Sequence, residues 1–403
     1  MTNSELIKKA QHYLNTLCVV NKTRRVGSQG NQQATAFFAD TIADFGFAPE
    51  SIPFDCIDLK YGDVRLTASD QSYQAYVSPY SLGWSGKAPL VVASTLEALE
   101  ALDASGKILL LRGDIAKEQL MPKNFTFFNP DHHREIYRLV EKANPSAIIA
   151  ATSRNPELAG GLYPFPLIED GDFDIPSVYM TEEEGERLAQ AAQHEVSLAF
   201  ESERIPSIGS NVYARKGGDP IRRIVVCAHI DAKDGTPGAL DNATGIVTLL
   251  VLAELLEDYT GEFAIELVAI NGEDYFGANG EVQLLEVNQG KFEEILLAVN
   301  IDAAGYIEGG THYSTYGTTP EQADAIRRAF ASYETIDEGP QWYQSDHSIF
   351  IQNGRPAVAI TSQEFMHLST YITHTTRDRP ELVDPRKLVD IAKSLRDLIE
   401  DLN

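Results

Sequence analysis

The segment from residue 221 to residue 256 constrains the fold most, because it predicts a buried strand, a loop and a helix in immediate succession. The strand, Ile224–His229, begins with three β-branched residues. A loop rich in glycine and proline follows and carries Asp231 and Asp241, and apolar residues at helical spacing then predict a helix at Thr244–Leu256. Ligands of open α/β sheets bind outside the carboxyl ends of the strands. The polar residues at the end of this strand are therefore candidates for a functional site.

The same alternation continues toward the C-terminus. Further strands are expected at Phe263–Ile270, Ile295–Ile301 and Ala357–Ile360. Helices are expected at 278–287, Pro320–Tyr333 and Pro385–Leu402, with a helical turn at Ser345–Ile351. Alternating strands and helices predict an α/β fold, with a mostly parallel mixed sheet flanked by helices.

Residues 51–205 interrupt this pattern with short strands, frequent turns and few helices. We therefore predict two domains. Residues 1–50 and 206–403 form the larger one, and residues 51–205 form a smaller β-rich domain inserted into it. A chain of 403 residues is long enough for such a division.

The composition limits the partners and the location. A formal net charge of -26 argues against nucleic acid and anionic membranes, because both select for basic surfaces. The N-terminal residues MTNSELIKKAQHYLNTL are polar and amphipathic, and this pattern predicts neither a signal peptide nor a membrane anchor. Cys18, Cys56 and Cys227 are too few and too scattered for a disulfide framework and fit a reducing compartment. A cytoplasmic protein is expected.

Potential metal ligands follow three of the predicted strands and also occupy two loops. These residues are His229, Asp231, Asp241, Glu273, Asp274, Asp302 and His374. Each alone could be a helix cap, a solvated charge or a packed histidine. Imidazole and carboxylate ligands without thiolate suit zinc, cobalt or manganese. Together they form the inventory of a two-metal hydrolytic site, with one spare carboxylate as general base.

Five motifs in order carry a family resemblance: AHID, PGALDNATG, NGED, NIDAAG and the pair SDHSIF…THT. They resemble the M28 family of co-catalytic zinc peptidases, which contains mostly aminopeptidases, with some carboxypeptidases and glutaminyl cyclases. The N-terminal stretch RRVGSQGNQQATAFFADTIADFGF is similar to the opening segment of that family. Within residues 51–205, the order of GKILLLRG, a helix, SAIIAAT and DFDIPSVYM resembles the protease-associated domain inserted in many peptidases. The alternative is another small α/β domain.

The resemblance implies two divalent metal ions per chain, with zinc in first place and cobalt or manganese as alternatives. It assigns the ligands to the two ions: His229 and Asp302 to one, Asp274 and His374 to the other, and Asp241 to both. It implies that Glu273 is the general base and that Asp231 holds the second ring nitrogen of His229. It also implies a cis peptide between Asp241 and Asn242.

The sequence departs from the family pattern at two positions. Asp274 stands where glutamate is usual, so this ligand is one methylene shorter. Thr373 stands where many family aminopeptidases have a tyrosine that helps polarise the scissile carbonyl. Tyr371 or His347 could supply that hydrogen bond, or the metals alone could suffice; packing of a loop is the alternative role for His347.

The resemblance implies an exopeptidase acting on peptides, and we expect an aminopeptidase. A carboxypeptidase or dipeptidase is an alternative, because a terminal carboxylate could bind to one of Arg327, Arg328, Arg355, Arg377 and Arg379. A glutaminyl cyclase is another alternative, although a complete bridging set favours two metals and hydrolysis. A non-catalytic, receptor-like binding protein is the least favoured, because this chain keeps every ligand. The sequence leaves the oligomeric state, the native metal and the side-chain specificity open.

Overall fold

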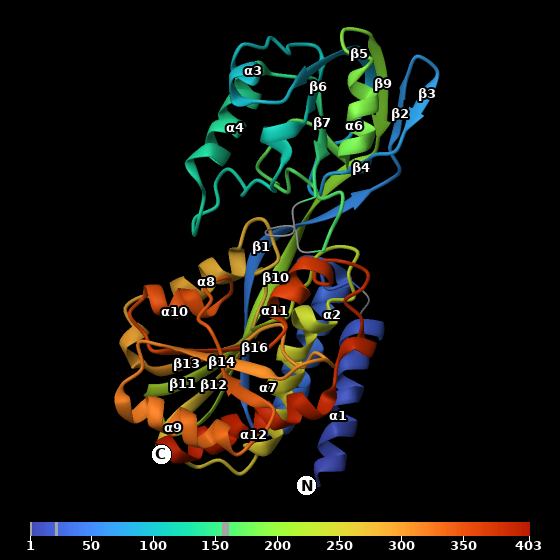
Figure 1. The fold of residues 1–403 in the computed structure, drawn as a ribbon. Helices are drawn as coiled ribbons and strands as arrows, with labels where there is room; N and C mark the ends of the chain where they lie inside the picture. Colours follow the sequence, from blue (N-terminus) through green and yellow to red (C-terminus); the bar gives the residue numbers. More distant parts are fainter. Residues whose placement is uncertain (1, 21–22, 155–160) are drawn as a thin grey trace. The chain divides into compact units, whose positions relative to one another are not determined.

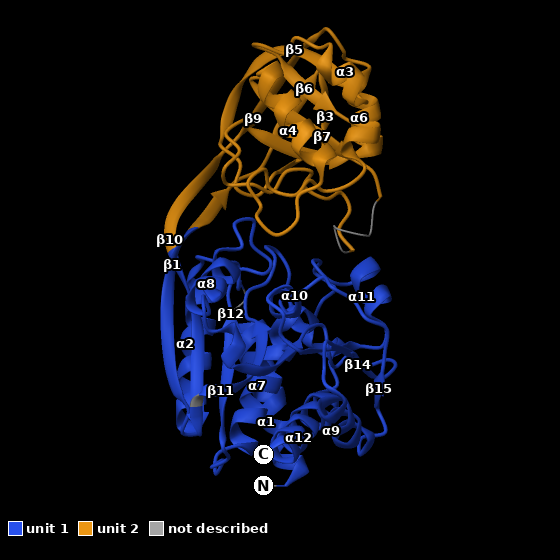
Figure 2. Cartoon of the chain, turned by 90° about the vertical axis from the view of Figure 1, so that its left-hand side faces the viewer, with its two compact units in different colours: residues 1–56, 208–403 blue, residues 57–207 orange. Residues whose placement is uncertain are grey.

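A computed structural model describes residues 2–20, 23–154 and 161–403 (Figure 1). The chain divides into two compact units (Figure 2). The first unit contains residues 1–56 and 208–403, and the second unit contains residues 57–207. The identity of the second unit as a protease-associated-like domain stays a prediction.

The sheet of the first unit is mixed, with a parallel centre. Its strand order is β1-β10-β12-β11-β13-β16-β14-β15. The strands are β1 (Ala48–Tyr61), β10 (Ser202–Gly217), β11 (Asp219–His229), β12 (Phe263–Ile270), β13 (Ile295–Ile301), β14 (Thr311–Tyr316), β15 (Ile336–Glu338) and β16 (Ala357–Ser362). The four neighbouring strands β12, β11, β13 and β16 run parallel, whereas β10 and β14 pair antiparallel with this core. The predicted mostly parallel mixed sheet is confirmed.

Helices flank this sheet (Figure 1). They are α1 (Asn3–Asn15), α2 (Gln29–Asp44), α7 (Thr244–Leu255), α8 (Asn279–Val287), α9 (Pro320–Ala331), α10 (His347–Gln352), α11 (Phe365–Tyr371) and α12 (Pro385–Leu402). Helix α7 is buried on nearly every side because it packs against α1, α2 and α12, and this burial explains its apolar sequence. Within the described ranges, no helix is long and apolar enough to cross a membrane.

The second unit contains a mixed sheet with the strand order β3-β2-β9-β5-β6-β7-β8-β4. The strands are β2 (Arg65–Ala68), β3 (Gln71–Tyr73), β4 (Tyr76–Val77), β5 (Trp84–Ala93), β6 (Ile108–Leu111), β7 (Ala147–Thr152), β8 (Ser177–Thr181) and β9 (Glu195–Phe200). Strands β5 to β8 are parallel neighbours, and the helices include α3 (Leu96–Glu100), α4 (Asp131–Ala143) and α6 (Glu182–Ala189). The core of this unit is apolar.

Candidate metal centre

The register of the parallel strands places the predicted site residues at one edge of the first sheet. His229, the last residue of β11, lies opposite Ile270, the last residue of β12. Ile301, the last residue of β13, lies opposite Ile360 of β16. The loops that follow these strands therefore start from the same edge, which is where ligands of open α/β sheets bind.

Asp241 lies between two histidines. Its Oδ1 is 3.2 Å from Nε2 of His229, and its Oδ2 is 3.2 Å from Nε2 of His374. The peptide between Asp241 and Asn242 is cis, as the resemblance implies. One carboxylate thus reaches two imidazoles with its two oxygens.

Each of these histidines faces a further carboxylate. Asp302 Oδ1 is 3.6 Å from Nε2 of His229, and Asp274 Oδ1 is 3.2 Å from Nε2 of His374. The five predicted ligands therefore form two groups that share Asp241. In both groups the nitrogen that faces the carboxylates is Nε2.

The donor atoms of these groups fit a divalent cation. His229 is fully buried, yet neither of its ring nitrogens has a hydrogen-bond partner among the described residues, and neither does Oδ2 of Asp274. Buried polar atoms without partners are costly and rare in folded proteins. Ligand atoms of His229, Asp241 and Asp274 all lie within 4.8 Å of one another, which is close enough for shared coordination.

Two further carboxylates hold the backbone around the ligands. Asp231 accepts the N–H groups of Gly272 (2.8 Å) and Asp274 (3.0 Å), and its Oδ1 is 3.6 Å from Nδ1 of His229. Asp378, which the sequence did not predict, accepts the N–H groups of Leu240 (2.7 Å) and Asp241 (3.0 Å). Both carboxylates therefore fix main-chain segments that carry ligands.

Comparison with known proteins finds a family that part of this chain resembles. Residues 211–399, a little under half of the chain, match the family model described as "Peptidase family M28". We call this matched region the M28 domain. All seven residues predicted for the site lie within this M28 domain.

The relatives and solved structures similar to this chain are mostly aminopeptidases. "Probable leucine aminopeptidase 2" of Aspergillus fumigatus is 27% identical over 318 residues, which cover 73% of this chain and 59% of that protein. "Aminopeptidase YwaD" of Bacillus subtilis is 24% identical over 372 residues, covering 87% of this chain and 75% of that protein. The chain thus spans about 60% of the length of the fungal relative.

Two solved structures share the fold. The zinc aminopeptidase BSAP from Bacillus subtilis aligns with a TM-score of 0.76 at 19% identity, covering 98% of this chain and 94% of that one. The aminopeptidase from Aneurinibacillus sp. strain AM-1 aligns with a TM-score of 0.72 at 20% identity, covering 99% and 95%. At these identities the likeness concerns the fold alone.

The charges of the M28 domain site are strongly coupled. Burial acts to lower the pKa of His229, but the nearby carboxylates of Asp231, Asp241 and Asp302 outweigh it and hold this pKa well above its usual range. His374 behaves in the same way, with burial opposed by Asp274 and Asp241. A cation bound between these groups would replace the protons, so metal binding and proton release are linked.

Glu273 is half-buried beside the two groups. Burial raises its pKa well above the usual range, the negative charges of Asp274, Asp302 and Asp346 raise it further, and His229 opposes them. A carboxylate with a raised pKa can both accept and release a proton near neutral pH.

A second pair of acidic side chains, Glu281 and Asp346, is buried behind the site, and the sequence did not predict it. Each carboxyl group influences the pKa of the other, and neither side-chain oxygen of Asp346 has a hydrogen-bond partner among the described residues. Asp346 is fully buried, and burial is the main cause that raises its pKa to about 7. Glu281 lies in the first turn of α8 and Asp346 lies just before α10, so only the structure shows that these two distant residues interact.

His347 has a packing role. Its Nε2 is 2.7 Å from the carbonyl oxygen of Trp342, and its ring lies 4.6 Å from the ring of Trp342, centroid to centroid. Burial lowers the pKa of His347, which keeps its ring neutral. Nε2 of His347 therefore already has a backbone carbonyl as its partner.

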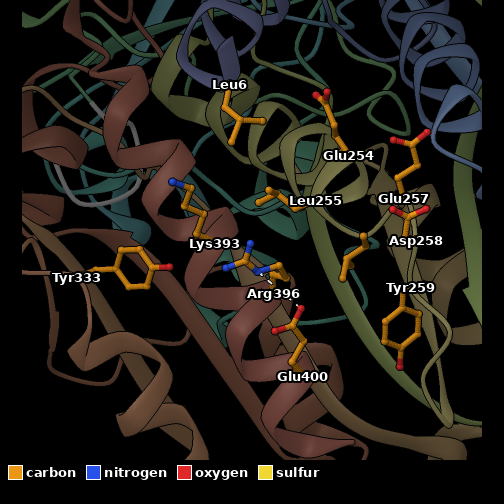
Figure 3. A pocket seen from close by; sticks show the side chains of 11 residues that line it. Leu6, Glu254, Leu255, Glu257, Asp258, Tyr259, Tyr333, Lys393, Arg396 and Glu400 are labelled. Atoms are coloured by element: carbon orange, nitrogen blue, oxygen red, sulfur yellow. Dashed lines mark ion pairs between the residues drawn. The ribbon is translucent and has the colours of Figure 1, made fainter. Parts of the chain in front are cut away.

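A pocket of about 650 Å³ lies elsewhere in the first unit (Figure 3). Residues of α1, α7 and α12, the segment 256–259 and Tyr333 line it, and none of them is a predicted ligand. Its two cationic side chains have partners, because Lys393 donates to Asn3 and Arg396 donates to Asp397. This pocket therefore shares no residue with the candidate metal centre.

The second unit contains another group of potential ligands, Glu118, His132 and His133. Nδ1 of His133 accepts the N–H of Met121 at 3.1 Å, so the neutral ring carries its hydrogen on Nε2. That nitrogen faces Oε1 of Glu118 at 3.7 Å, and it has no lone pair for a metal ion. The geometry of this group therefore does not fit a metal site.

Proposed function

We propose that this protein is a metal-dependent exopeptidase that removes N-terminal residues from peptides. The observation that carries the proposal is the position of Asp241, with one carboxylate oxygen facing each of two histidines and a further carboxylate beside each histidine. Such an arrangement fits a two-metal hydrolytic site. The M28 family match and the aminopeptidase names of the relatives support the same reaction class.

In this proposal His229 and Asp302 would hold one ion, His374 and Asp274 would hold the other, and Asp241 would be a ligand of both. Divalent ions at these positions, with zinc in first place and cobalt or manganese as alternatives, supply Lewis acidity that activates a water molecule and polarises the scissile carbonyl. Asp231 faces Nδ1 of His229 and so keeps the Nε2 lone pair directed at the ion.

Glu273 moves the proton. Its carboxylate takes a proton from the attacking water and then passes it to the nitrogen of the departing amine. The raised pKa of this side chain suits both halves of the transfer. The shorter Asp274 reaches His374 Nε2 at 3.2 Å, so a glutamate is not needed at this position for that contact.

The arginines of the carboxypeptidase alternative are already engaged, and this favours an aminopeptidase. Arg327 and Arg328 pair with Asp324 and Asp401. The other three donate to backbone carbonyls: Arg355 to Gly354, Arg377 to Tyr371 and Arg379 to Thr376. The site itself is rich in carboxylates, which attract the ammonium group of a peptide N-terminus.

We also propose that the second unit is a protease-associated-like domain and that the protein is cytoplasmic. Four parallel strands with flanking helices support the first assignment. The three cysteines, all buried and widely separated in sequence, support the second.

The test is a titration of the metal-free chain with zinc, cobalt or manganese while hydrolysis is measured. The substrates are aminoacyl anilides, N-blocked peptides and N-terminal glutaminyl peptides. We expect activity to saturate near about two ions per chain and only on substrates with a free amine. Cleavage from the C-terminal end would reverse the substrate direction, and cyclisation of glutaminyl peptides with one ion would move the assignment to a cyclase. Zinc binding without turnover on any substrate would refute an enzyme.

A further inference from the structure

The loop that ends in Asp241 is held by two buried side chains of opposite charge. The Arg24 guanidinium donates to the carbonyl oxygens of Pro237 (Nη1, 2.9 Å) and Gly238 (Nη2, 2.6 Å). The Asp378 carboxylate accepts the N–H groups of Leu240 (Oδ1, 2.7 Å) and Asp241 (Oδ2, 3.0 Å). The Arg24 cation thus binds the carbonyl groups at the start of this short loop, and the Asp378 anion binds the N–H groups at its end.

Arg24 also reaches the strand that carries His229. Its Nε donates to the carbonyl oxygen of Ile230 at 2.9 Å, one residue beyond His229, and its Nη1 donates to the carbonyl of Leu17 at 3.0 Å. The side chain is only 2% exposed. One guanidinium therefore fixes the main chain beside a terminal ligand and beside the bridging ligand, using the planar fork of donors that lysine lacks.

The two charges stabilise one another as well as the loop. Asp378 is fully buried; burial and the charge of Asp241 disfavour its ionised form, whereas the N–H groups of Leu240 and Asp241 and the positive charge of Arg24 favour it. A buried charge that loses its partners is strongly unfavourable, so each side chain depends on the other and on the peptide groups between them. Side chains of the protein thus supply hydrogen-bond partners to both ends of the loop.

We propose that Arg24 and Asp378 are positioning residues that hold Asp241 in its metal-binding place before an ion arrives. This inference rests on the proposed function, because it takes Asp241 as the bridging ligand. Arg24 and Asp378 should raise the metal affinity, because less of the loop then remains to be ordered when an ion binds. It leaves the proton transfer by Glu273 unchanged once ions are bound.

The first experiment uses the full chain with Asp378→Asn and Arg24→Lys. Asparagine keeps one acceptor but replaces the second by an amide that cannot accept, and lysine keeps the charge but cannot span the four carbonyls that Arg24 reaches. We expect zinc affinity, measured by competition with a chelator, to fall about 10- to 100-fold. We expect kcat at saturating zinc to stay within a few-fold of the wild-type value. Asp384→Asn is the matched control, because Asp384 accepts a backbone N–H at the start of α12 and should leave the affinity unchanged.

A folded variant with wild-type zinc affinity would overturn the proposal, even if its melting temperature fell, because a purely structural role lowers stability without changing affinity. The second experiment needs no variant. Hydrogen exchange of the metal-free wild type should show protected amides at Leu240 and Asp241, and free exchange at both would overturn the proposal. Wild-type chain that binds zinc tightly but hydrolyses no peptide would refute the proposed function while leaving the affinity comparison intact.

Discussion

The two sheets of this protein have similar centres and different ends. In the first unit, β12, β11, β13 and β16 are parallel neighbours, and in the second unit β5, β6, β7 and β8 are parallel neighbours. Strands β12, β6 and β7 are buried along their whole length. The residues at the carboxyl ends of the strands differ in type. Strand β11 ends at His229 and Asp231 lies just beyond it, whereas Arg112 follows β6 and Ser153 follows β7.

The difference shows that the parallel sheet supplies only a place for a site. Buried apolar strands stabilise both units in the same way, and the residues just beyond them decide whether a metal ion can bind. The M28 domain concentrates imidazoles and carboxylates there and supports them with Asp231 and Asp378. The predictions below test this comparison.

The largest effect is expected for Asp241→Ala. It removes the carboxylate that faces both histidines, so zinc content and activity should fall together, with a loss in kcat/KM of at least about 10³-fold. Metal analysis and hydrolysis assays measure the two quantities. Asp114→Ala is the control from the other sheet, because Asp114 is an exposed carboxylate soon after β6. Wild-type zinc content in Asp241→Ala would contradict the bridging role.

Glu273→Gln should separate metal binding from chemistry. The amide cannot carry the proton, so we expect kcat to fall about 10²- to 10⁴-fold while the zinc content stays at the wild-type value. Steady-state kinetics with parallel metal analysis is the measurement. Normal turnover by this variant would remove Glu273 from its assigned role.

No effect is expected from changing the histidines of the second unit. His133 presents an N–H to Glu118, so His132→Ala and Glu118→Gln should leave the number of zinc ions per chain unchanged. Metal analysis after dialysis against zinc tests this. A reduced zinc content in either variant would break the contrast between the two units.

The last prediction concerns the pH dependence of stability in the metal-free chain. The pKa of Asp346 is raised from 3.8 to about 7 in the folded state, so its stabilising contribution is complete below about pH 4 and is lost as pH rises through about 7. Asp346→Asn should therefore flatten the decline in unfolding free energy over this range, by at most about 1.4 kcal/mol per pH unit. Urea unfolding at several pH values gives the slope.

Asp170→Asn in the second unit is the comparison for that slope. Asp170 is also buried, but it accepts the N–H groups of Lys123 and Asp172, which favour its ionised form. We expect a smaller change in slope than for Asp346→Asn. Equal slopes in the wild type and Asp346→Asn would mean that Asp346 does not titrate in this range.

The sequence predicted the regular elements of the first unit well where burial is complete. Strands β12 and β13 and helix α12 have the predicted bounds, because uninterrupted apolar runs or a clear helical spacing define them. The long strands β1 and β10 were not predicted, since they are largely exposed or half-buried and contain Pro53 and Pro206. Apolar residues at helical spacing predict a helix from Ala34 to Phe45, and helix α2 begins earlier, at Gln29, because Ser28 caps it and its first residues are polar.

The candidate ligands could be found from sequence because they follow apolar strands in a fixed order. The structure brings all five together, but their metal-binding roles stay predictions. Arg24 and Asp378 could not be found in this way, because their partners are main-chain groups, which leave no residue pattern. The same holds for Glu281 and Asp346, whose pairing depends on packing between distant segments.

The neighbouring positions of β1 and β10 in the first sheet have a consequence for how the chain can change over evolution. The second unit, about 150 residues, departs from one of these strands and returns on the next. In the first unit, the second unit thus takes the place of a long connection between two adjacent strands. Each doubling of such a connection costs only about 0.6 kcal/mol of closure entropy. Exchange of the inserted module for a shorter or different one is thus a small thermodynamic step, which leaves the metal-binding edge free to be conserved on its own.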